Sequence, residues 1–443
     1  MRITHNSFLL WGNFRALLPL FAALLSTLVV PLCGDSVAAQ TSHFDLTKPQ
    51  PVYTDEQGYG YDLLPPPSSA ATVPTGSPAG PNAPFYFSVK VPDGNYRVRV
   101  ILGGKKHGHT TVRAEGRRLM LENISTPKAK DSQTFEFVVN KRSPEIQPGK
   151  RVKIKEREKD YLAWDDKLTL EFNGDRPAVK AIHIEPDDHV PTIYLCGNST
   201  VVDQNNEPWA SWGQMITRWF GPGVAVSNHA ESGLSARTFL ASFRLDKILA
   251  TLKPGDYVFV EFGHNDEKEK QPGDGAWYHY THQLKIFVDQ VRAKGADIVF
   301  CTPTQRRMFT TDGKTIVNTH GDFPAAMKSV AEREHVPLID LNKMTTDLYL
   351  ALGPEDSKHL LVHYPANTFP AQDKALADNT HFNPFGAYEV AKCVIMGIKQ
   401  LELPLTQFLR PKWQDFDPKH PDDWRSFKWA PAPNTELLKP DGN

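Results

Sequence analysis

Short runs of alternating apolar and polar residues characterise the first half of the chain. Seven such runs, separated by turn residues, occupy residues 85–91, 96–102, 110–121, 135–139, 152–155, 168–172 and 179–184. Alternation with a period of two is typical of half-buried strands, and seven short strands without a convincing helix favour a β-sandwich. We therefore predict an all-β domain over residues 40–187, starting near Phe44. Residues 64–84 are rich in Pro, Ser, Ala and Gly and predict a loop.

After Asp188 the pattern changes to strands that alternate with helices. Almost wholly apolar runs predict strands at 192–196, 224–227, 257–262, 298–302 and 337–341. Helical spacing of apolar residues lies between and after them, at 208–220, 235–252, 277–294, 323–335 and 385–401. Apolar strands separated by helices predict a parallel sheet covered on both faces, so residues 188–405 are expected to form an α/β domain. Residues 406–443 show no clear element and are treated as a C-terminal extension.

The first 39 residues have the pattern of a secretory signal peptide. Arg2 and Arg15 precede an apolar run over residues 16–32, and small residues follow, with cleavage expected after Ala39. An uncleaved membrane anchor and lipidation of Cys33 remain alternatives, although Leu32 is bulky where lipidation usually requires a small residue. The pattern predicts a secreted or periplasmic protein with no membrane association after cleavage.

Composition narrows the class of protein. The 443 residues are 40% hydrophobic and 23% charged, which is enough apolar material for packed cores and excludes general disorder. The formal net charge is −1, from 50 basic and 51 acidic residues, so a dedicated nucleic-acid binder is not indicated. Four cysteines are too few for a disulfide scaffold, and none forms a C-x-x-C pair. Cys196, Cys301 and Cys393 are interpreted as buried thiols.

Polar clusters follow the predicted strands at the edge where parallel sheets place their binding sites. They comprise residues 197–200, 228–233 and 263–266, together with 378–381 in a predicted loop before the last helix. Taken one at a time, each cluster is more simply explained as a helix cap or a turn. Because all of them occupy equivalent places in the topology, we interpret them as parts of one site.

The residue types in these clusters suit attack by a hydroxyl group on an ester. A Ser199 nucleophile needs a base, for which His381 is suited, and Asp378 can hold the imidazole in the required tautomer. The resulting oxyanion needs donors aimed at it in advance. The backbone N–H groups of Ser199 and Gly233 and the side-chain amide of Asn265 are candidates.

These blocks resemble those of the GDSL or SGNH hydrolases, over about residues 192–400. The resemblance implies a flavodoxin-like three-layer α/β/α fold in which Ser199, Gly233, Asn265 and His381 are the four name-giving positions and Asp378 completes the triad. Asn198 departs from the Asp usual in the superfamily pattern, which puts the local loop structure in question rather than the activity.

A narrower resemblance is to rhamnogalacturonan acetylesterases, carbohydrate esterase family twelve. It rests on residues 197–203, 235–239, 261–266 and 378–387, with Leu234 departing from a common Arg. Bacterial relatives often carry an N-terminal β-sandwich resembling galactose-binding modules, which fits the predicted all-β domain. The resemblance implies a serine esterase that removes acetyl groups from pectic poly- or oligosaccharide through an acetyl-serine intermediate, with no metal or organic cofactor.

Cationic side chains near the cleft would help to recognise an anionic galacturonate backbone. Arg237, Arg306 and Arg307 are the candidates. Three alternatives stay open: another carbohydrate, lipid or thioester hydrolase of the superfamily, a non-catalytic glycan-binding protein, and a metal site using His264, His279 and His282. The histidines lack the carboxylate pattern that would complete a zinc site.

Overall fold

The N-terminal part of the chain forms two facing antiparallel sheets. A computed structural model describes residues 41–64, 83–104, 106–126, 132–411, 413–433 and 437–441. One sheet has the order β1(Ser42–Asp45), β11(Val179–Pro186), β4(Gly94–Leu102), β7(Gln133–Lys141). The other has the order β2(Tyr59–Asp62), β3(Phe85–Lys90), β10(Lys167–Asn173), β5(Gly108–Ala114), β6(Arg118–Thr126).

The core of this sandwich comes from alternate residues of both sheets. Val98 and Val100 on β4 are fully buried, as are Phe85 and Phe87 on β3 and Phe172 on β10. Phe85 and Phe172 stack with their ring centroids 5.0 Å apart. The predicted alternation therefore locates the buried face correctly, because every second side chain of a strand points to the same side.

Two of the seven predicted strands are wrong in detail. The run 110–121 is a hairpin of β5 and β6, because the chain reverses at Glu115 and Arg117, whose φ values are +54° and +66°. Residues 152–155 are not a strand; they follow a small hairpin of β8(Glu145–Gln147) and β9(Lys150–Arg151). Of the predicted loop at 64–84, residues 65–82 lie outside the described residues, as do the expected signal peptide and Cys33.

The α/β region contains a parallel sheet with the order β13(Ala225–Asn228), β12(Thr192–Gly197), β14(Tyr257–Glu261), β15(Asp297–Cys301), β16(Leu338–Ile339). Counted along the chain from β12, this is the flavodoxin-like order 2-1-3-4-5. The strands are buried on both faces, as predicted: Ile193 and Leu195 pack in one core, whereas Tyr194 and Cys196 pack in the other. The order changes direction next to β12, so the loop after that strand lies at the usual position of a site in such folds.

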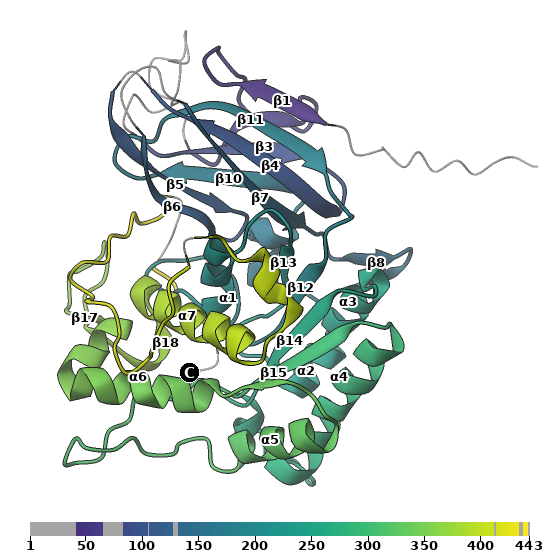
Figure 1. The fold of residues 1–443 in the computed structure, drawn as a ribbon, viewed down its shortest axis with the longest axis vertical. Helices are drawn as coiled ribbons and strands as arrows, with labels where there is room; N and C mark the ends of the chain where they lie inside the picture. Colours follow the sequence, from purple (N-terminus) through teal and green to yellow (C-terminus); the bar gives the residue numbers. More distant parts are fainter. Residues whose placement is uncertain are drawn as a thin grey trace, which may run out of the picture. The chain divides into compact units, whose positions relative to one another are not determined.

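Helices cover both faces of this sheet and complete three layers (Figure 1). The layer on the Ile193 side contains α1(Trp212–Met215), α6(Leu341–Asp356) and α7(Pro384–Gln400). The layer on the Tyr194 side contains α2(Ala236–Ala241), α3(Arg244–Thr251), α4(Thr281–Ala293) and α5(Phe323–Arg333). No helix of the described residues is long and apolar enough to span a membrane.

Three elements of this region differ from the sequence prediction. The helix expected at 235–252 is interrupted at Phe243, whose φ is +63°, and continues as a separate helix. Helix α6 was not predicted. Residues 378–381 lie in strand β18(Leu376–Phe382), which pairs with β17(Leu361–Tyr364), and not in a loop.

The β5–β6 turn packs directly under the loop that follows β12. Gln214 donates to the carbonyl of Gly116 at 2.8 Å, and a Cβ at Gly116 would lie 2.8 Å from the Cβ of Asp203. Arg118, almost completely buried, donates to the carbonyl of Val226 at 2.7 Å. These buried polar contacts join the sandwich and the α/β layers, and the described residues of 39–443 form one compact unit.

The C-terminal extension contacts both regions of this unit. The guanidinium carbon of Arg113, in the sandwich, lies 4.1 Å from the ring centroid of Trp429. The indole N–H of Trp429 donates to the carboxylate of Glu207 at 2.9 Å. Asn173 donates to the carbonyl of Pro431 at 2.9 Å. The extension therefore ties β5 and β10 to the segment between β12 and α1.

Candidate active site

A hydrogen-bonded chain links three of the predicted site residues. Ser199 follows β12, and its Oγ lies 2.8 Å from Nε2 of His381 on β18. Nδ1 of His381 lies 2.8 Å from Oδ2 of Asp378. With the Nδ1 proton donated to the carboxylate, Nε2 is an acceptor and can take the proton of the Ser199 hydroxyl. The structure thus brings these side chains together in the order that nucleophile activation requires.

Asp378 is held as a carboxylate by more than the imidazole. Its Oδ1 accepts hydrogen bonds from the backbone N–H groups of Thr380 and His381, at 2.8 and 3.0 Å. Burial acts to raise the pKa of Asp378, but the hydrogen bond and charge of His381 and these two backbone donors outweigh it and lower the pKa to about 2. The group is therefore ionised at any pH at which the enzyme would work.

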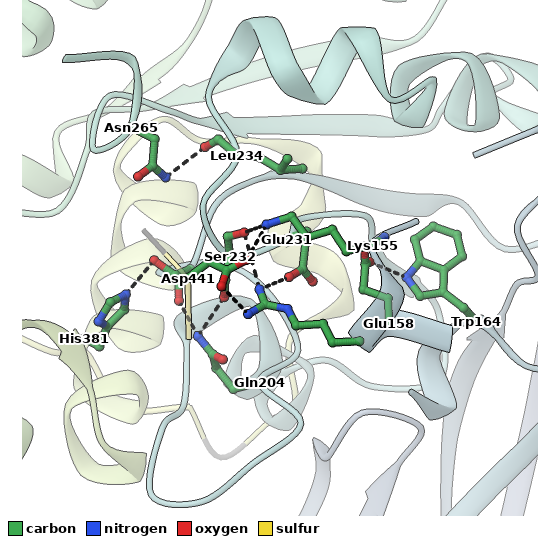
Figure 2. Close-up of polar contacts among 12 residues, drawn as sticks. Lys155, Glu158, Trp164, Gln204, Glu231, Ser232, Leu234, Asn265, His381 and Asp441 are labelled. Carbon is green, nitrogen blue, oxygen red and sulfur yellow. Dashed lines mark hydrogen bonds and ion pairs between the residues drawn. The ribbon is translucent and has the colours of Figure 1, made fainter. Parts of the chain in front are cut away.

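The candidate oxyanion donors lie on the loops that follow the neighbouring strands β13, β12 and β14. Gly233 and Asn265 line the same surface cavity, of about 400 Å³. Gly233 has φ +79°, a conformation that L side chains rarely adopt. The Asn265 amide donates one N–H to the carbonyl of Leu234 at 3.0 Å, and because an amide carries two such hydrogens, the second is available for a substrate oxygen (Figure 2).

Two side chains fix the backbone carbonyl of the nucleophile. Ser211 Oγ donates to the Ser199 carbonyl at 2.6 Å, and Gln204 Nε2 donates to it at 2.8 Å. Asn198, the departure from the superfamily pattern, accepts a hydrogen bond from the backbone N–H of Thr200, and its Oδ1 lies 2.9 Å from the Thr200 hydroxyl oxygen. Asn198 thus holds the turn around Ser199 with its side-chain oxygen.

A buried glutamate lies beneath this turn. Glu261, at the end of β14, accepts hydrogen bonds from the Thr200 hydroxyl at 2.8 Å, the Trp212 indole and the Thr304 backbone N–H. Burial raises the pKa of Glu261, and although these three donors oppose the change, the pKa reaches about 7. Glu261 connects the nucleophile turn to α1 and to the loop after β15.

The sandwich supports the same loop from the opposite side. Arg117 donates to the carbonyls of Gln204 and Trp209, at 3.0 and 3.1 Å, and forms an ion pair with Glu207 at 2.6 Å. Gln204 in turn donates to the Ser199 carbonyl. The buried Arg117 of the sandwich is therefore linked to the nucleophile through one residue, Gln204.

The three arginines predicted to bind substrate all have partners within the protein. Arg237 pairs with Asp274 and, at 3.1 Å, with Glu269. Arg306 pairs with Glu267 at 2.6 Å, whereas Arg307 donates to the side chains of Ser357 and Asn379, each at 2.9 Å. Their roles toward substrate stay predictions.

Two cations missed by the sequence analysis lie beside Gly233. Lys155 and Arg157 belong to the segment after β9, which begins with the wrongly predicted strand 152–155 and carries a run of alternating charges over residues 153–159. A Cβ at Gly233 would lie 3.2 Å from Nζ of Lys155. The charge run was the available signal, but such runs usually form solvated faces, and nothing local indicates contact with a loop some 75 positions later.

Among the described residues, no group of three or more His, Cys, Asp or Glu side chains is arranged to hold a metal ion. The rings of His264 and His320 meet edge to face, with centroids 4.6 Å apart, and His279 contacts Arg237 at 3.1 Å. Burial lowers the pKa of His264 well below its usual value. Cys196, Cys301 and Cys393 are buried free thiols, as predicted.

Comparison with known proteins supports the family assignment. Residues 195–387 match the model of the GDSL-like lipase/acylhydrolase family. The chain is 43% identical to rhamnogalacturonan acetylesterase RhgT of Bacillus subtilis over 219 residues, 49% of this chain and 93% of that protein. It is 26% identical to a rhamnogalacturonan acetylesterase of Emericella nidulans over 242 residues, 50% of this chain and 90% of that protein.

A third relative extends into the sandwich. The uncharacterized esterase YxiM of Bacillus subtilis is 29% identical over 320 residues, 71% of this chain and 74% of that protein. The serine, glycine, asparagine and histidine positions described above all lie within the matched residues 195–387. Together with the flavodoxin-like sheet, these matches show that the chain belongs to the GDSL-like lipase/acylhydrolase family, the SGNH hydrolases.

Proposed function

We propose that the protein is a serine esterase that removes acetyl groups from rhamnogalacturonan, the pectic polysaccharide. The observation that carries the proposal is the continuous hydrogen-bonded chain from Ser199 through His381 to Asp378, in a chain 43% identical to a rhamnogalacturonan acetylesterase. A binding protein would need neither an activated hydroxyl nor an ionised carboxylate behind an imidazole.

The reaction follows from the geometry. Ser199 Oγ attacks the acetyl carbonyl carbon while its proton passes to Nε2 of His381. The charge that develops on the carbonyl oxygen is stabilised by the backbone N–H groups of Ser199 and Gly233 and by the amide of Asn265. Asp378, with its pKa near 2, stabilises the imidazolium without taking its proton.

Collapse of the tetrahedral intermediate breaks the bond to the sugar oxygen. His381 gives its proton to that oxygen, so the sugar leaves as an alcohol and Ser199 carries the acetyl group. A water molecule then attacks the acetyl-serine, with His381 again as the base, and acetate leaves as Ser199 regains its proton. We further propose that the enzyme acts outside the cytoplasm, as the signal-like pattern of residues 1–39 indicates.

A substrate panel tests this function. We expect kcat/KM for acetate release from acetylated rhamnogalacturonan oligosaccharides to exceed that from acetylated xylooligosaccharides by at least about tenfold, and 4-nitrophenyl palmitate to be a poor substrate. A preference for the xylan fragments would assign the enzyme to another carbohydrate, and a preference for palmitate would favour the lipid hydrolase alternative. Absence of turnover on every ester, 4-nitrophenyl acetate included, would contradict the esterase assignment.

A further inference from the structure

A pair of cations beside the oxyanion hole holds a carboxylate of the protein itself. Nζ of Lys155 lies 2.8 Å from one oxygen of Asp441, and Nη1 of Arg157 lies 2.9 Å from the other. Asp441 belongs to the C-terminal extension, and its side chain is 53% exposed, against 30% for Lys155 and 20% for Arg157. The carboxylate of Asp441 is thus more exposed to solvent than the two cations that hold it.

The two cations are fixed in place by contacts other than Asp441. Arg157 forms an ion pair with Glu231, whose side chain is only 3% exposed. Nζ of Lys155 donates to the carbonyl of Ser232 at 2.6 Å. The buried carboxylate of Glu231 thus contacts Arg157, whereas the exposed carboxylate of Asp441 contacts both cations.

The segment that carries both cations is anchored in the core. Glu158, which is completely buried, pairs with Arg244 of α3 through both carboxylate oxygens, at 2.7 and 2.6 Å, and accepts a hydrogen bond from Trp164 at 3.0 Å. Its Oε2 also accepts the backbone N–H of Lys155 at 2.7 Å. A cation held at its own backbone in this way is preorganised for a ligand.

The position of the pair relates it to the reaction. The Ser232 carbonyl that Lys155 contacts belongs to the same peptide unit as the Gly233 N–H, one of the proposed oxyanion donors. A Cβ at Gly233 would lie 3.0 Å from the Cβ of Asp441, and Lys155, Gly233, Asn265 and Asp441 line one cavity. An anion on the cation pair therefore shares a cavity with Gly233 and Asn265, two residues of the proposed oxyanion hole.

We propose that Lys155 and Arg157 form a carboxylate-binding subsite that takes a uronate of the substrate, and that Asp441 occupies this subsite until the substrate displaces it. The inference rests on the proposed function, because only an acidic polysaccharide offers carboxylates at sugar spacing. Two cations that each contact one oxygen of the same carboxylate can form charge-assisted hydrogen bonds with a uronate. A neutral acetylated sugar has no carboxylate with which to form them. Arg237 and Arg306 differ, since their carboxylate partners lie on neighbouring loops of the same α/β layers. Arg307 differs as well, since it donates to the uncharged side chains of Ser357 and Asn379.

The test compares an acetylated rhamnogalacturonan oligosaccharide with the same oligosaccharide after reduction of its uronate carboxyl groups to alcohols. For the unaltered protein, kcat/KM should favour the acidic form by at least about tenfold, which corresponds to about 1.4 kcal/mol. Lys155→Gln should reduce this preference to about twofold or less, whatever its effect on the two individual rates. Lys159→Gln is the matched control: this exposed lysine of the same segment pairs with Glu156, and the variant should keep the tenfold preference.

The extension gives a second, independent measurement. Asp441→Asn should lower KM for the acidic oligosaccharide at least about threefold, because the neutral amide competes less well for the cations. In the Lys155→Gln background the same substitution should give no such gain. A preference that persists in Lys155→Gln, or an Asp441→Asn effect that is equal in both backgrounds, overturns the subsite.

Failure of the proposed function would be recognised separately. If neither oligosaccharide is deacetylated while 4-nitrophenyl acetate is hydrolysed, the subsite is assayed by inhibition of that hydrolysis with digalacturonate and with its carboxyl-reduced form. The acidic disaccharide should inhibit at a concentration at least about tenfold lower, and Lys155→Gln should remove the difference. Equal inhibition by the two forms in the unaltered protein overturns the proposal.

Discussion

The hydroxyl oxygen of Ser199 lies 2.8 Å from Nε2 of His381, although 182 positions separate the two residues along the chain. We expect Ser199→Ala to lower kcat for acetate release by about 10⁴-fold or more, because it removes the hydroxyl that His381 is placed to deprotonate. Acetate release from acetylated oligosaccharide measures this. Ser242→Ala, which removes a hydroxyl that donates to the Phe239 carbonyl, serves as the control. Turnover of Ser199→Ala within tenfold of the unaltered enzyme would rule out the nucleophile.

Asp378→Asn should keep the fold but lose most of the rate. The backbone N–H groups of Thr380 and His381 hold the amide oxygen, so the amide NH2 group faces Nδ1 and the imidazole adopts the wrong tautomer. We expect kcat to fall by about 10³- to 10⁴-fold. Stability should also lose part of its dependence on pH. The pKa of Asp378 is about 2 in the folded protein, below the 3.8 of an unperturbed Asp, so its stabilisation is complete above pH 3.8 and lost as the pH falls through 2.

Acid unfolding of the two proteins measures this second effect. The loss of stability between pH 4 and pH 2 should be smaller in Asp378→Asn than in the unaltered protein, by about 2 kcal/mol. Identical acid unfolding curves would show that the carboxylate is not held as the structure indicates.

Asn265→Ala should lower kcat by about 10²- to 10³-fold with a smaller change in KM, since the amide N–H is needed most by the oxyanion. The substitution also frees the Leu234 carbonyl, so thermal unfolding should accompany the kinetics. Asn318→Ala, on an exposed turn, provides the control. A tenfold rise in KM at unchanged kcat would instead assign Asn265 to ground-state binding.

Glu261 should make the protein less stable as the pH rises. Its folded pKa of about 7 exceeds the 4.5 of an unperturbed Glu, so the folded state keeps the proton longer. Stability from this group is complete below pH 4.5 and is lost as the pH rises through 7, by up to about 3 kcal/mol. Urea unfolding at pH 5 and pH 8 should show this slope, and Glu261→Gln should flatten it. An equal slope in the variant would contradict the assignment.

Arg244→Ala should destabilise the protein by about 3–5 kcal/mol, because it leaves the buried carboxylate of Glu158 without its cation. The double variant Arg244→Met/Glu158→Gln should be clearly more stable than Arg244→Ala in urea unfolding. A double variant as unstable as Arg244→Ala would show that the lost stability comes from packing around the two side chains and not from an unpaired charge on Glu158.

Much of the fold could be predicted because its signals are local. Ile193, Tyr194, Leu195 and Cys196 form a continuous apolar run, and both faces of this strand are in fact buried. The hairpin of β5 and β6 could not be predicted, because Glu115 and Arg117 adopt positive φ in its turn. Glycine or asparagine is the usual sequence signal for that conformation. Tertiary contacts stabilise that turn: Glu115 accepts the backbone N–H of Thr169 at 2.9 Å.

The candidate site shows the same division. Ser199, Asp378 and His381 could be proposed because their chemistry restricts the residue types and because the cluster of Ser199 follows a predicted strand. The position of Asp378 and His381 within β18 was not predicted. Lys155 and Arg157 could not be proposed, since lysine and arginine on a charged segment are usually solvated. Their place in the site depends on contacts with Ser232 and Glu231 that form only in the folded chain. Long-range contacts of this kind leave no spacing pattern.

The turn residues Gly116, Arg117 and Arg118 pack under the loop of the nucleophile, so the β-sandwich and the α/β region cannot be separated without exposing buried polar groups. Removing the sandwich would leave the Asp203 carboxylate and the Val226 carbonyl without their buried partner and expose the surface that Leu119 covers. A shortened chain starting at residue 188 should therefore aggregate, and scanning calorimetry of the whole protein should record a single melting transition. This protein carries its β-sandwich as a part of its own framework, and grafting that module onto another catalytic domain would transfer buried arginines without their partners.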